Sequence, residues 1–160
     1  MYASAKELSR FVDKVLKATG ATKVDIVGHS EGSVLPRLYF KYLDGVAKTA
    51  SVQYGTTLDG IASILKARGL FDLPQGLLSP LCMACFQLIK GSSLLNDLNR
   101  GSDAYPEVIY LMLVSKFDEF VTPYTSGFLK TTGPNIFNVK LQSLCPRDFS
   151  GHLEQLDDHK

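Results

Sequence analysis

The sequence predicts an α/β protein with a mostly parallel sheet that helices cover on both faces. Two observations indicate this class. Segments with the apolar spacing of a helix alternate along the chain with short aliphatic runs. These runs, such as Val108–Val114, are continuously apolar, which is typical of strands buried on both faces. With 160 residues the chain is long enough for one core, and we expect residues 1–160 to form a single domain.

The first element should be a helix that begins at Ser4. The residues from Ser4 to Glu7 fit a capping box, in which serine and glutamate bond the unpaired N–H groups of the first turn. Gly20 is placed to end the helix, because glycine readily takes the left-handed conformation of a helix C-cap. The apolar residues between these ends share one helical face: Leu8, Phe11, Val12, Val15 and Leu16.

A strand and a second helix are expected next. Val24–Val27 indicates a short buried strand, and residues 31–43 indicate a helix that Gly45 closes. Pro36 lies inside this helix and lacks a backbone N–H group. We therefore expect a kink there.

The rest of the chain contains three further strand candidates and one helix. Thr49–Tyr54 is a weak strand candidate, whereas Val108–Val114 is the strongest in the chain. Ile136–Leu144 indicates another strand, and Leu94–Leu98 a short helix. The stretch 70–80 mixes proline and glycine with leucines, which predicts a loop.

Composition and charge exclude several classes of protein. The 17 basic and 16 acidic residues give a net charge of +1, which offers no electrostatic basis for binding nucleic acid or an anionic membrane. No apolar stretch reaches the length of about 20 residues that a membrane-spanning helix needs. The N-terminus also lacks the basic-then-apolar pattern of a secretory signal.

Residues 24–32 read Val-Asp-Ile-Val-Gly-His-Ser-Glu-Gly. A Gly-x-Ser-x-Gly pattern is weak alone, but here a predicted strand precedes it and a helix follows. This is the context of a nucleophile elbow, a sharp turn that raises a serine hydroxyl above the sheet. Ser30 is the predicted nucleophile, and the N–H group of Glu31 the predicted oxyanion donor. Gly28 and Gly32 should lack side chains because strand and helix pack closely there.

A serine hydroxyl needs a base to take its proton, and the base needs an acid to orient it. In folds with this elbow, the acid follows the serine and the histidine comes last. His29 adjoins Ser30 and is expected to pack or to line the cleft, and His159 is next to last in the chain. His152, in a loop after the last strand, is therefore the predicted base.

Three carboxylates could orient that histidine. Asp118 stands just beyond Val108–Val114, at the carboxyl end of a predicted strand, and is the favoured acid. Glu119 is its neighbour, and Asp148 lies close to His152 in the sequence. Both remain alternatives.

The chain has three cysteines, Cys82, Cys85 and Cys145. The odd number allows one disulfide and one free thiol, or no disulfide. Cys82 and Cys85 have the spacing of a redox motif, but they lie in a loop rich in proline and leucine. A redox role is therefore disfavoured.

Five different groups of residues, in order along the chain, carry a resemblance to a known family. They are Gly28-His29-Ser30-Glu31-Gly32 with Pro36-Arg37; Gly55-Thr56-Thr57-Leu58-Asp59-Gly60; Gly91-Ser92 with Leu94, Leu98 and Asn99; Asp118-Glu119 with Val121-Thr122-Pro123-Tyr124; and Leu141-Gln142 with Leu144-Cys145-Pro146, Asp148 and His152-Leu153. In these groups the chain resembles the class 2 lipases, secreted α/β-hydrolase lipases and esterases. The resemblance covers nearly the whole chain. It implies the C-terminal part of an α/β-hydrolase fold, truncated before the first strands, the signal peptide and the loop with the second oxyanion donor.

The resemblance also implies a function. Ser30, Asp118 and His152 would hydrolyse carboxylic esters such as acylglycerols through an acyl-enzyme, with no metal or organic cofactor. The partner would be a lipid or small ester, without nucleic acid or stable membrane insertion, and the protein would be extracellular. Cys85 would pair with Cys145, leaving Cys82 free.

Alternatives remain open at this point. Residues 70–86 could form a lid or the wall of an acyl pocket, or their leucines could simply be buried. The chain could also be a catalytically impaired fragment that binds a partner or a lipid. A serine acyltransferase or thioesterase on the same scaffold is the third reading.

Overall fold

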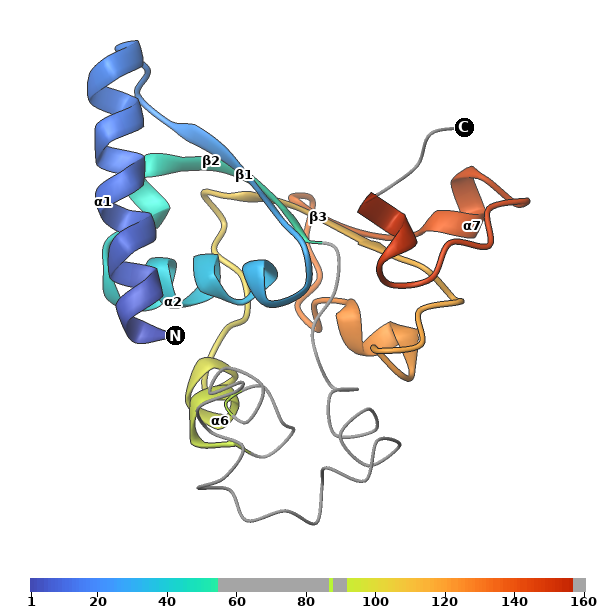
Figure 1. Ribbon diagram of the computed structural model, residues 1–160. Helices are drawn as coiled ribbons and strands as arrows, with labels where there is room; N and C mark the ends of the chain where they lie inside the picture. The colour runs from blue at the N-terminus through green and yellow to red at the C-terminus, as the bar shows by residue number, and fades with distance from the viewer. Residues whose placement is uncertain (55–86, 88–91, 157–160) are drawn as a thin grey trace.

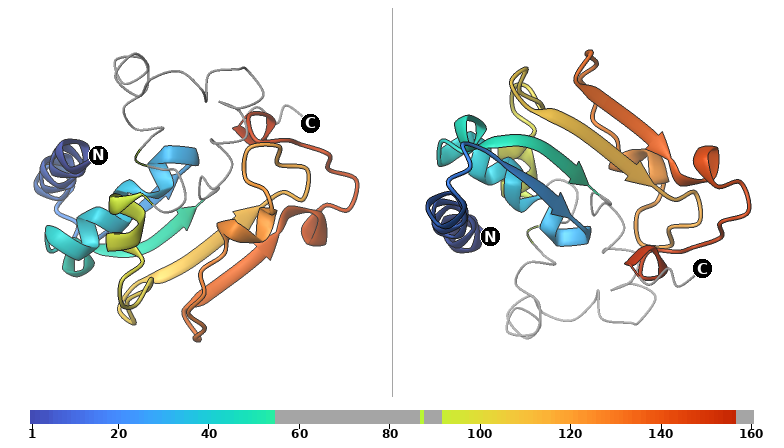
Figure 2. Two further views of the ribbon diagram at one scale, coloured as in Figure 1. Left: turned by 90° about the horizontal axis from the view of Figure 1, so that it is seen from below. Right: turned by 90° about the horizontal axis from the view of Figure 1, so that it is seen from above.

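The computed structural model describes residues 1–54, 87 and 92–156 (Figure 1). Within these residues, four strands form one parallel sheet in the order β1-β2-β3-β4, and all four arrows point the same way in Figure 2. The predicted parallel α/β class is confirmed. The strands are β1 Val24–Gly28, β2 Thr49–Tyr54, β3 Ile109–Val114 and β4 Ile136–Lys140, and the α-helices are α1 Tyr2–Thr19, α2 Leu35–Tyr42, α6 Ser93–Leu98 and α7 Leu141–Leu144.

Helix α1 begins at Tyr2, with Met1 as its N-cap and no side-chain capping bond. The prediction of a capping box at Ser4 is therefore wrong, because Ser4 already lies inside the first turn. The other end is as predicted. Gly20 has a φ of 73° and its N–H group donates to the carbonyl oxygen of Leu16 at 2.9 Å.

The buried face of α1 is narrower than expected. Val12 is buried in the core, and Leu8 and Leu16 pack against the same cluster. Phe11 is 63% exposed, so its assignment to the buried face is wrong. Helix α1 packs on α2, which places both helices in one layer.

The segment after β1 is divided in two instead of forming one kinked helix. A 3₁₀ helix over Ser30–Ser33 comes first, and α2 follows from Leu35. Pro36 lies in the first turn of α2, where backbone N–H groups have no partner within the helix to lose. Pro36 therefore starts α2 and does not bend it.

The elements from β2 onward follow the predictions except at one end. Strand β2 has the predicted bounds, and Ser92 caps α6 by accepting the N–H group of Leu95 at 3.2 Å. The strand predicted to reach Leu144 stops at Lys140, and the next four residues form the helical turn α7. In this turn the side chain of Gln142 is buried against the end of β3, where it makes hydrogen bonds.

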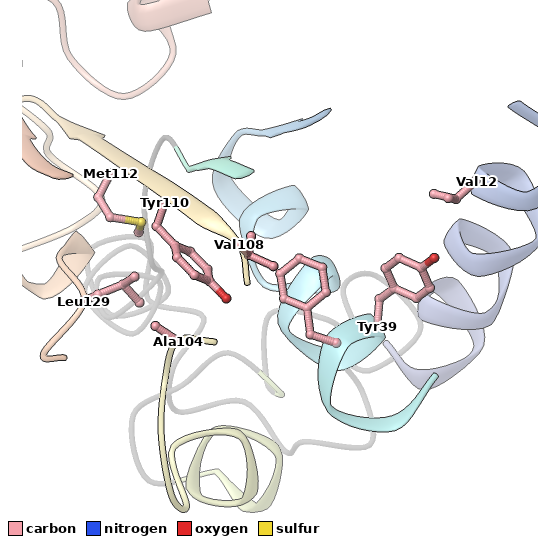
Figure 3. Packing of buried hydrophobic residues seen from close by; sticks show 8 residues of the cluster. Val12, Tyr39, Ala104, Val108, Tyr110, Met112 and Leu129 are labelled. Carbon is pink, nitrogen blue, oxygen red and sulfur yellow. The ribbon is translucent and has the colours of Figure 1, made fainter. Parts of the chain in front are cut away.

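The main core lies between the sheet and the layer of α1 and α2. Tyr110 and Met112 project from β3 toward Ala104 and Leu129 in Figure 3. Eight buried residues form this cluster: Val12, Tyr39, Phe40, Ala104, Val108, Tyr110, Met112 and Leu129. The core thus fixes one face of β3 against the helical layer.

The two faces of the sheet differ. Helices α2 and α6 lie on one side of the strands in both views of Figure 2. On the other side, Val27 is 76% exposed, Ile109 53% and Phe137 50%. Within the ranges 1–54 and 92–156, helical cover is therefore seen on one face, although the sequence predicts it on both. Residues 70–86, expected as a lid or acyl-pocket loop, lie outside the described residues.

Candidate active site

Ser30 sits on a sharp turn between β1 and the 3₁₀ helix. His29 is extended, with φ of −120° and ψ of 139°, whereas Ser30 has a φ of 56°. A positive φ is uncommon for a residue other than glycine and costs free energy unless its surroundings enforce it. Here the hydroxyl of Ser33 donates to the carbonyl oxygen of Ser30 at 2.5 Å, and the N–H group of Gly32 to that of His29 at 2.9 Å. Local bonds therefore hold Ser30 in the conformation expected of an elbow.

The two glycines of the elbow are not equivalent. A Cβ atom on Gly28 would lie 2.5 Å from the carbonyl oxygen of Gly32 and 3.0 Å from the Cα of Ser33. Such distances to backbone atoms exclude a side chain, as predicted. A Cβ atom on Gly32 would meet no atom of the described residues within 4 Å. The prediction that close packing excludes a side chain at Gly32 is therefore wrong, as far as the described part of the chain is concerned.

The structure brings together three residues that the sequence separates by up to 122 positions. The Nε2 atom of His152 lies 2.9 Å from the Oγ of Ser30. The Nδ1 atom of the same ring lies 2.9 Å from Oδ2 and 3.1 Å from Oδ1 of Asp118. His152 is 2% exposed and Asp118 4% exposed. This is a continuous hydrogen-bonded series from a buried carboxylate through a buried imidazole to the half-buried hydroxyl of Ser30.

The surroundings of Asp118 keep its carboxylate ionised. Burial by itself raises the pKa of Asp118, but the hydrogen bond from His152 opposes it. The N–H groups of Val121 and Phe120 donate to Oδ1 at 2.8 and 2.9 Å and also favour the charged form. Together these bonds outweigh burial and hold the pKa of Asp118 below its ordinary value.

The two other candidate acids bind the backbone near His152. Glu119 Oε2 accepts the N–H group of His152 at 3.0 Å, and Asp148 Oδ1 accepts that of Ser150 at 2.8 Å. Both ring nitrogens of His152 are already engaged, by Asp118 and by Ser30. The geometry therefore favours Asp118 as the acid.

Comparison with known proteins identifies the family of the chain and a structure with a similar fold. Residues 3–159 match the family described as Lipase (class 2). The chain belongs to the class 2 lipase family. The crystal structure of Aspergillus fumigatus lipase B is similar, with a TM-score of 0.67 and 14% sequence identity. This match covers 94% of our chain and 37% of that lipase, and at this identity it supports the fold alone, a partial α/β-hydrolase fold.

In this member of the class 2 lipase family, the predicted oxyanion donor belongs to the 3₁₀ helix that carries Ser30. Glu31 follows Ser30 in the first turn of the 3₁₀ helix Ser30–Ser33. The N–H groups of a first helical turn have no carbonyl partner within the helix and point outward from its start.

The sequence did not indicate the side chains that fix the His152 loop. Ser115 donates through Oγ to the carbonyl oxygen of Ser150 at 2.7 Å. Gln142 donates to Ser115 Oγ at 2.9 Å and to the carbonyl oxygen of Asp148 at 3.1 Å. Neither residue belongs to a catalytic pattern, and their contacts depend on the tertiary fold. His29 also contacts this loop, through the carbonyl oxygen of His152. Its position beside Ser30 is the one feature of the sequence that could indicate such a contact.

One of the three cysteines, Cys145, lies in the part of the chain that the structure describes. Cys145 is exposed, and its predicted partner Cys85 lies outside the described residues, as does Cys82. In the ranges that the structure describes, no cluster of three or more His, Cys, Asp or Glu residues is suited to hold a metal ion. Over the same ranges, none of the helices combines the length and the apolar character needed to cross a bilayer.

Proposed function

We propose that this class 2 lipase hydrolyses carboxylic esters, with Ser30 as nucleophile, His152 as general base and Asp118 as the orienting acid. The observation that supports this most directly is the hydrogen-bonded series from Asp118 through His152 to Ser30 on a strained elbow. Membership of a lipase family supports the same reaction class.

The hydrogen bonds of His152 supply a path for each proton transfer of the proposed reaction. In the tautomer with its proton on Nδ1, His152 donates to Asp118, and its Nε2 accepts the proton of Ser30 Oγ as the oxygen attacks the ester carbonyl. The resulting imidazolium then gives this proton to the departing alcohol, leaving an acyl group on Ser30. Water repeats the sequence, with His152 again as base, and releases the acid. Asp118 stays ionised throughout, in keeping with its lowered pKa.

The N–H group of Glu31 would stabilise the tetrahedral oxyanion in both steps. One donor of this kind contributes about 10²–10³ in turnover. A backbone donor cannot be removed by substituting a side chain, so its role depends on the elbow conformation. A side chain at position 28 would clash with the backbone of the elbow. Gly28 therefore helps to keep both Ser30 and the N–H group of Glu31 in position for the reaction.

The substrate and location belong to the same proposal. Acylglycerols and small carboxylic esters are the substrates that the family supports, and the family alone supports an extracellular location. A single domain over residues 1–160 and a lid or acyl-pocket loop over 70–86 are proposed from the sequence.

The direct test combines a fluorophosphonate probe with a chromogenic short-chain ester. The parent protein should be labelled at Ser30 and should hydrolyse the ester. Ser30→Ala should lose the label, and turnover should fall by about 10⁶ if the residues act as a unit. Ser143→Ala, which changes an exposed serine of α7, is the matched control and should behave like the parent. Hydrolysis that persists in Ser30→Ala, or a folded parent that takes no label, would contradict the proposal.

A further inference from the structure

The backbone of His152 is held from both sides by side chains outside the proposed triad. Its carbonyl oxygen lies 3.0 Å from Nε2 of His29, and its N–H group donates to Oε2 of Glu119 at 3.0 Å. His29 precedes Ser30, and Glu119 follows Asp118. Each of the two residues that bind the His152 ring therefore has a sequence neighbour that binds the His152 backbone.

The ring of His152 is also bounded by two aromatic rings. Phe120 stacks on it, with centroids 4.7 Å apart and an interplanar angle of 22°. His29 lies against it at 4.8 Å with an angle of 48°. His29 thus touches both the ring and the carbonyl group of His152, and it links their positions to the elbow.

The protonation of His29 suits this role. Burial holds the pKa of His29 below its ordinary value, although the hydrogen bond to the carbonyl oxygen of His152 acts in the opposite direction. A neutral ring with its proton on Nε2 donates to the carbonyl oxygen of His152 without adding a positive charge beside the imidazolium that forms during catalysis. The contact is then compatible with every step of the proposed reaction.

The carboxylate of Glu119 occupies the space beside Gly151, where glycine has no side chain. A Cβ atom on Gly151 would collide with Oε2 of Glu119, the oxygen that accepts the His152 N–H group. A side chain at position 151 would therefore displace this carboxylate. Gly151 provides an independent way to weaken the contact without changing Glu119 itself.

A base must lie within hydrogen-bond reach of its nucleophile, and a displacement of about 1 Å can cost about 10²-fold in rate. We propose that His29 and Glu119 are positioning residues that clamp the backbone of His152 and so set the distance between His152 and Ser30. This inference rests on the proposed function and adds two residues to its machinery, neither of which reacts.

Two matched pairs of substitutions test the clamp. His29→Gln keeps a donor near the position of Nε2, whereas His29→Met has a similar shape without one. Glu119→Gln keeps an oxygen acceptor, and Glu119→Met removes it. Three quantities should be measured for each variant: the rate of fluorophosphonate labelling, the low-field proton signal of the His152 Nδ1–H bonded to Asp118, and the melting temperature.

The Met variants should be labelled about tenfold more slowly than the parent, with a weakened low-field signal. The Gln variants should stay within about threefold of the parent. Gly151→Ala should resemble Glu119→Met. All melting temperatures should stay close to that of the parent, because each change removes a single bond near the surface. If His29→Met does not fold, the Glu119 pair decides.

The outcomes separate this inference from the proposed function. Met variants that match the parent in labelling and in the low-field signal would overturn the clamp while leaving the function intact. A folded parent without the low-field signal would also overturn it. If the parent shows the signal but takes no label, and the Met variants weaken the signal, the clamp stands and the proposed function fails.

Discussion

The elbow at Ser30 and the loop at His152 meet at one site, but they are held in different ways. The elbow is closed by hydrogen bonds between residues three positions apart, such as that from Ser33 to Ser30. The His152 loop has short-range bonds too, such as that from Gln142 to Asp148, but it is also held by bonds to residues 33 to 123 positions away, the longest of them from His29. One half of the site is therefore a local steric device, and the other is a product of tertiary structure.

This difference should govern how each half fails. A clash in the elbow involves backbone atoms that have no room to move, so the loss should be abrupt. Several separate side-chain hydrogen bonds hold the His152 loop, so removing one of them should lower its stability only in part.

The largest effect is expected for Gly28→Ala. Its Cβ atom would lie 2.5 Å from the carbonyl oxygen of Gly32, and relief of this contact requires the strand or the 3₁₀ helix to shift. We expect a loss of about 3 kcal/mol in the free energy of unfolding, measured by urea denaturation. Labelling of Ser30 by a fluorophosphonate should be lost with it.

Gly32→Ala is the matched control in the same elbow. A Cβ atom there meets no described atom within 4 Å, and alanine favours a helical turn more than glycine does. The free energy of unfolding should change by less than about 0.5 kcal/mol. Equal losses for the two variants would show that steric closure at Gly28 does not define the elbow.

A smaller loss is expected for Gln142→Leu, on the other side of the comparison. The amide of Gln142 accepts the N–H group of Lys116 at 3.0 Å and donates to Ser115 and Asp148. Leucine has a similar volume but leaves these groups without that partner, which should cost about 2 kcal/mol. Urea denaturation measures this loss, and fluorophosphonate labelling should slow while remaining detectable.

Ser143→Ala, one residue away and exposed, should leave both quantities unchanged. Complete loss of labelling in Gln142→Leu with a small change in stability would mean that the loop depends on this one anchor. The contrast between a distributed and a local support would then be wrong.

The same contrast explains what the sequence predicted. Strands β2 and β3 and the elbow could be predicted because their signals lie within a few neighbouring residues. The proximity of Ser30, Asp118 and His152 could be predicted because their order along the chain fits one fold. The predicted start of α1 was wrong because the sequence is compatible with several starts, and a cap at Ser4 is only one of them. The exposure of Phe11 depends on which face meets α2, which the helical period alone does not determine.

The supporting residues of His152 could not be predicted for a related reason. Gln142 lay in an apolar run that favours a strand, yet α7 forms there and its amide is buried against the acid loop. The sequence makes Glu119 a candidate acid for the ring of His152, whereas in the structure its carboxylate binds the backbone N–H group of His152. In both cases the residue type was informative, and the partner was supplied by the fold.

The smallest effect is expected from acid, and it should act on the His152 loop before the elbow. The bonds that close the elbow, at Ser33 and Gly32, involve no carboxylate, whereas Asp118 joins the acid loop to His152. The folded-state pKa of Asp118 is lowered, so the unfolded chain binds the proton more readily. Stability from Asp118 is therefore fully present above its unfolded pKa and is lost as the pH falls through the folded value. The effect is modest because burial raises the pKa and offsets part of what the hydrogen bonds contribute.

Asp118→Asn removes this titration, so its free energy of unfolding should fall less steeply with acid than that of the parent, in urea denaturation below about pH 5. Glu107→Gln changes an exposed carboxylate away from the Ser30 elbow and the His152 loop. Its free energy of unfolding should depend on pH as steeply as that of the parent. Amide proton shifts locate the change. Those of Phe120 and Val121, which donate to Asp118, should move with the acid transition, whereas that of Gly32 should not. If Gly32 moved in step with them, the elbow would share the ionic support of the loop, and the two halves of the site would be one cooperative unit.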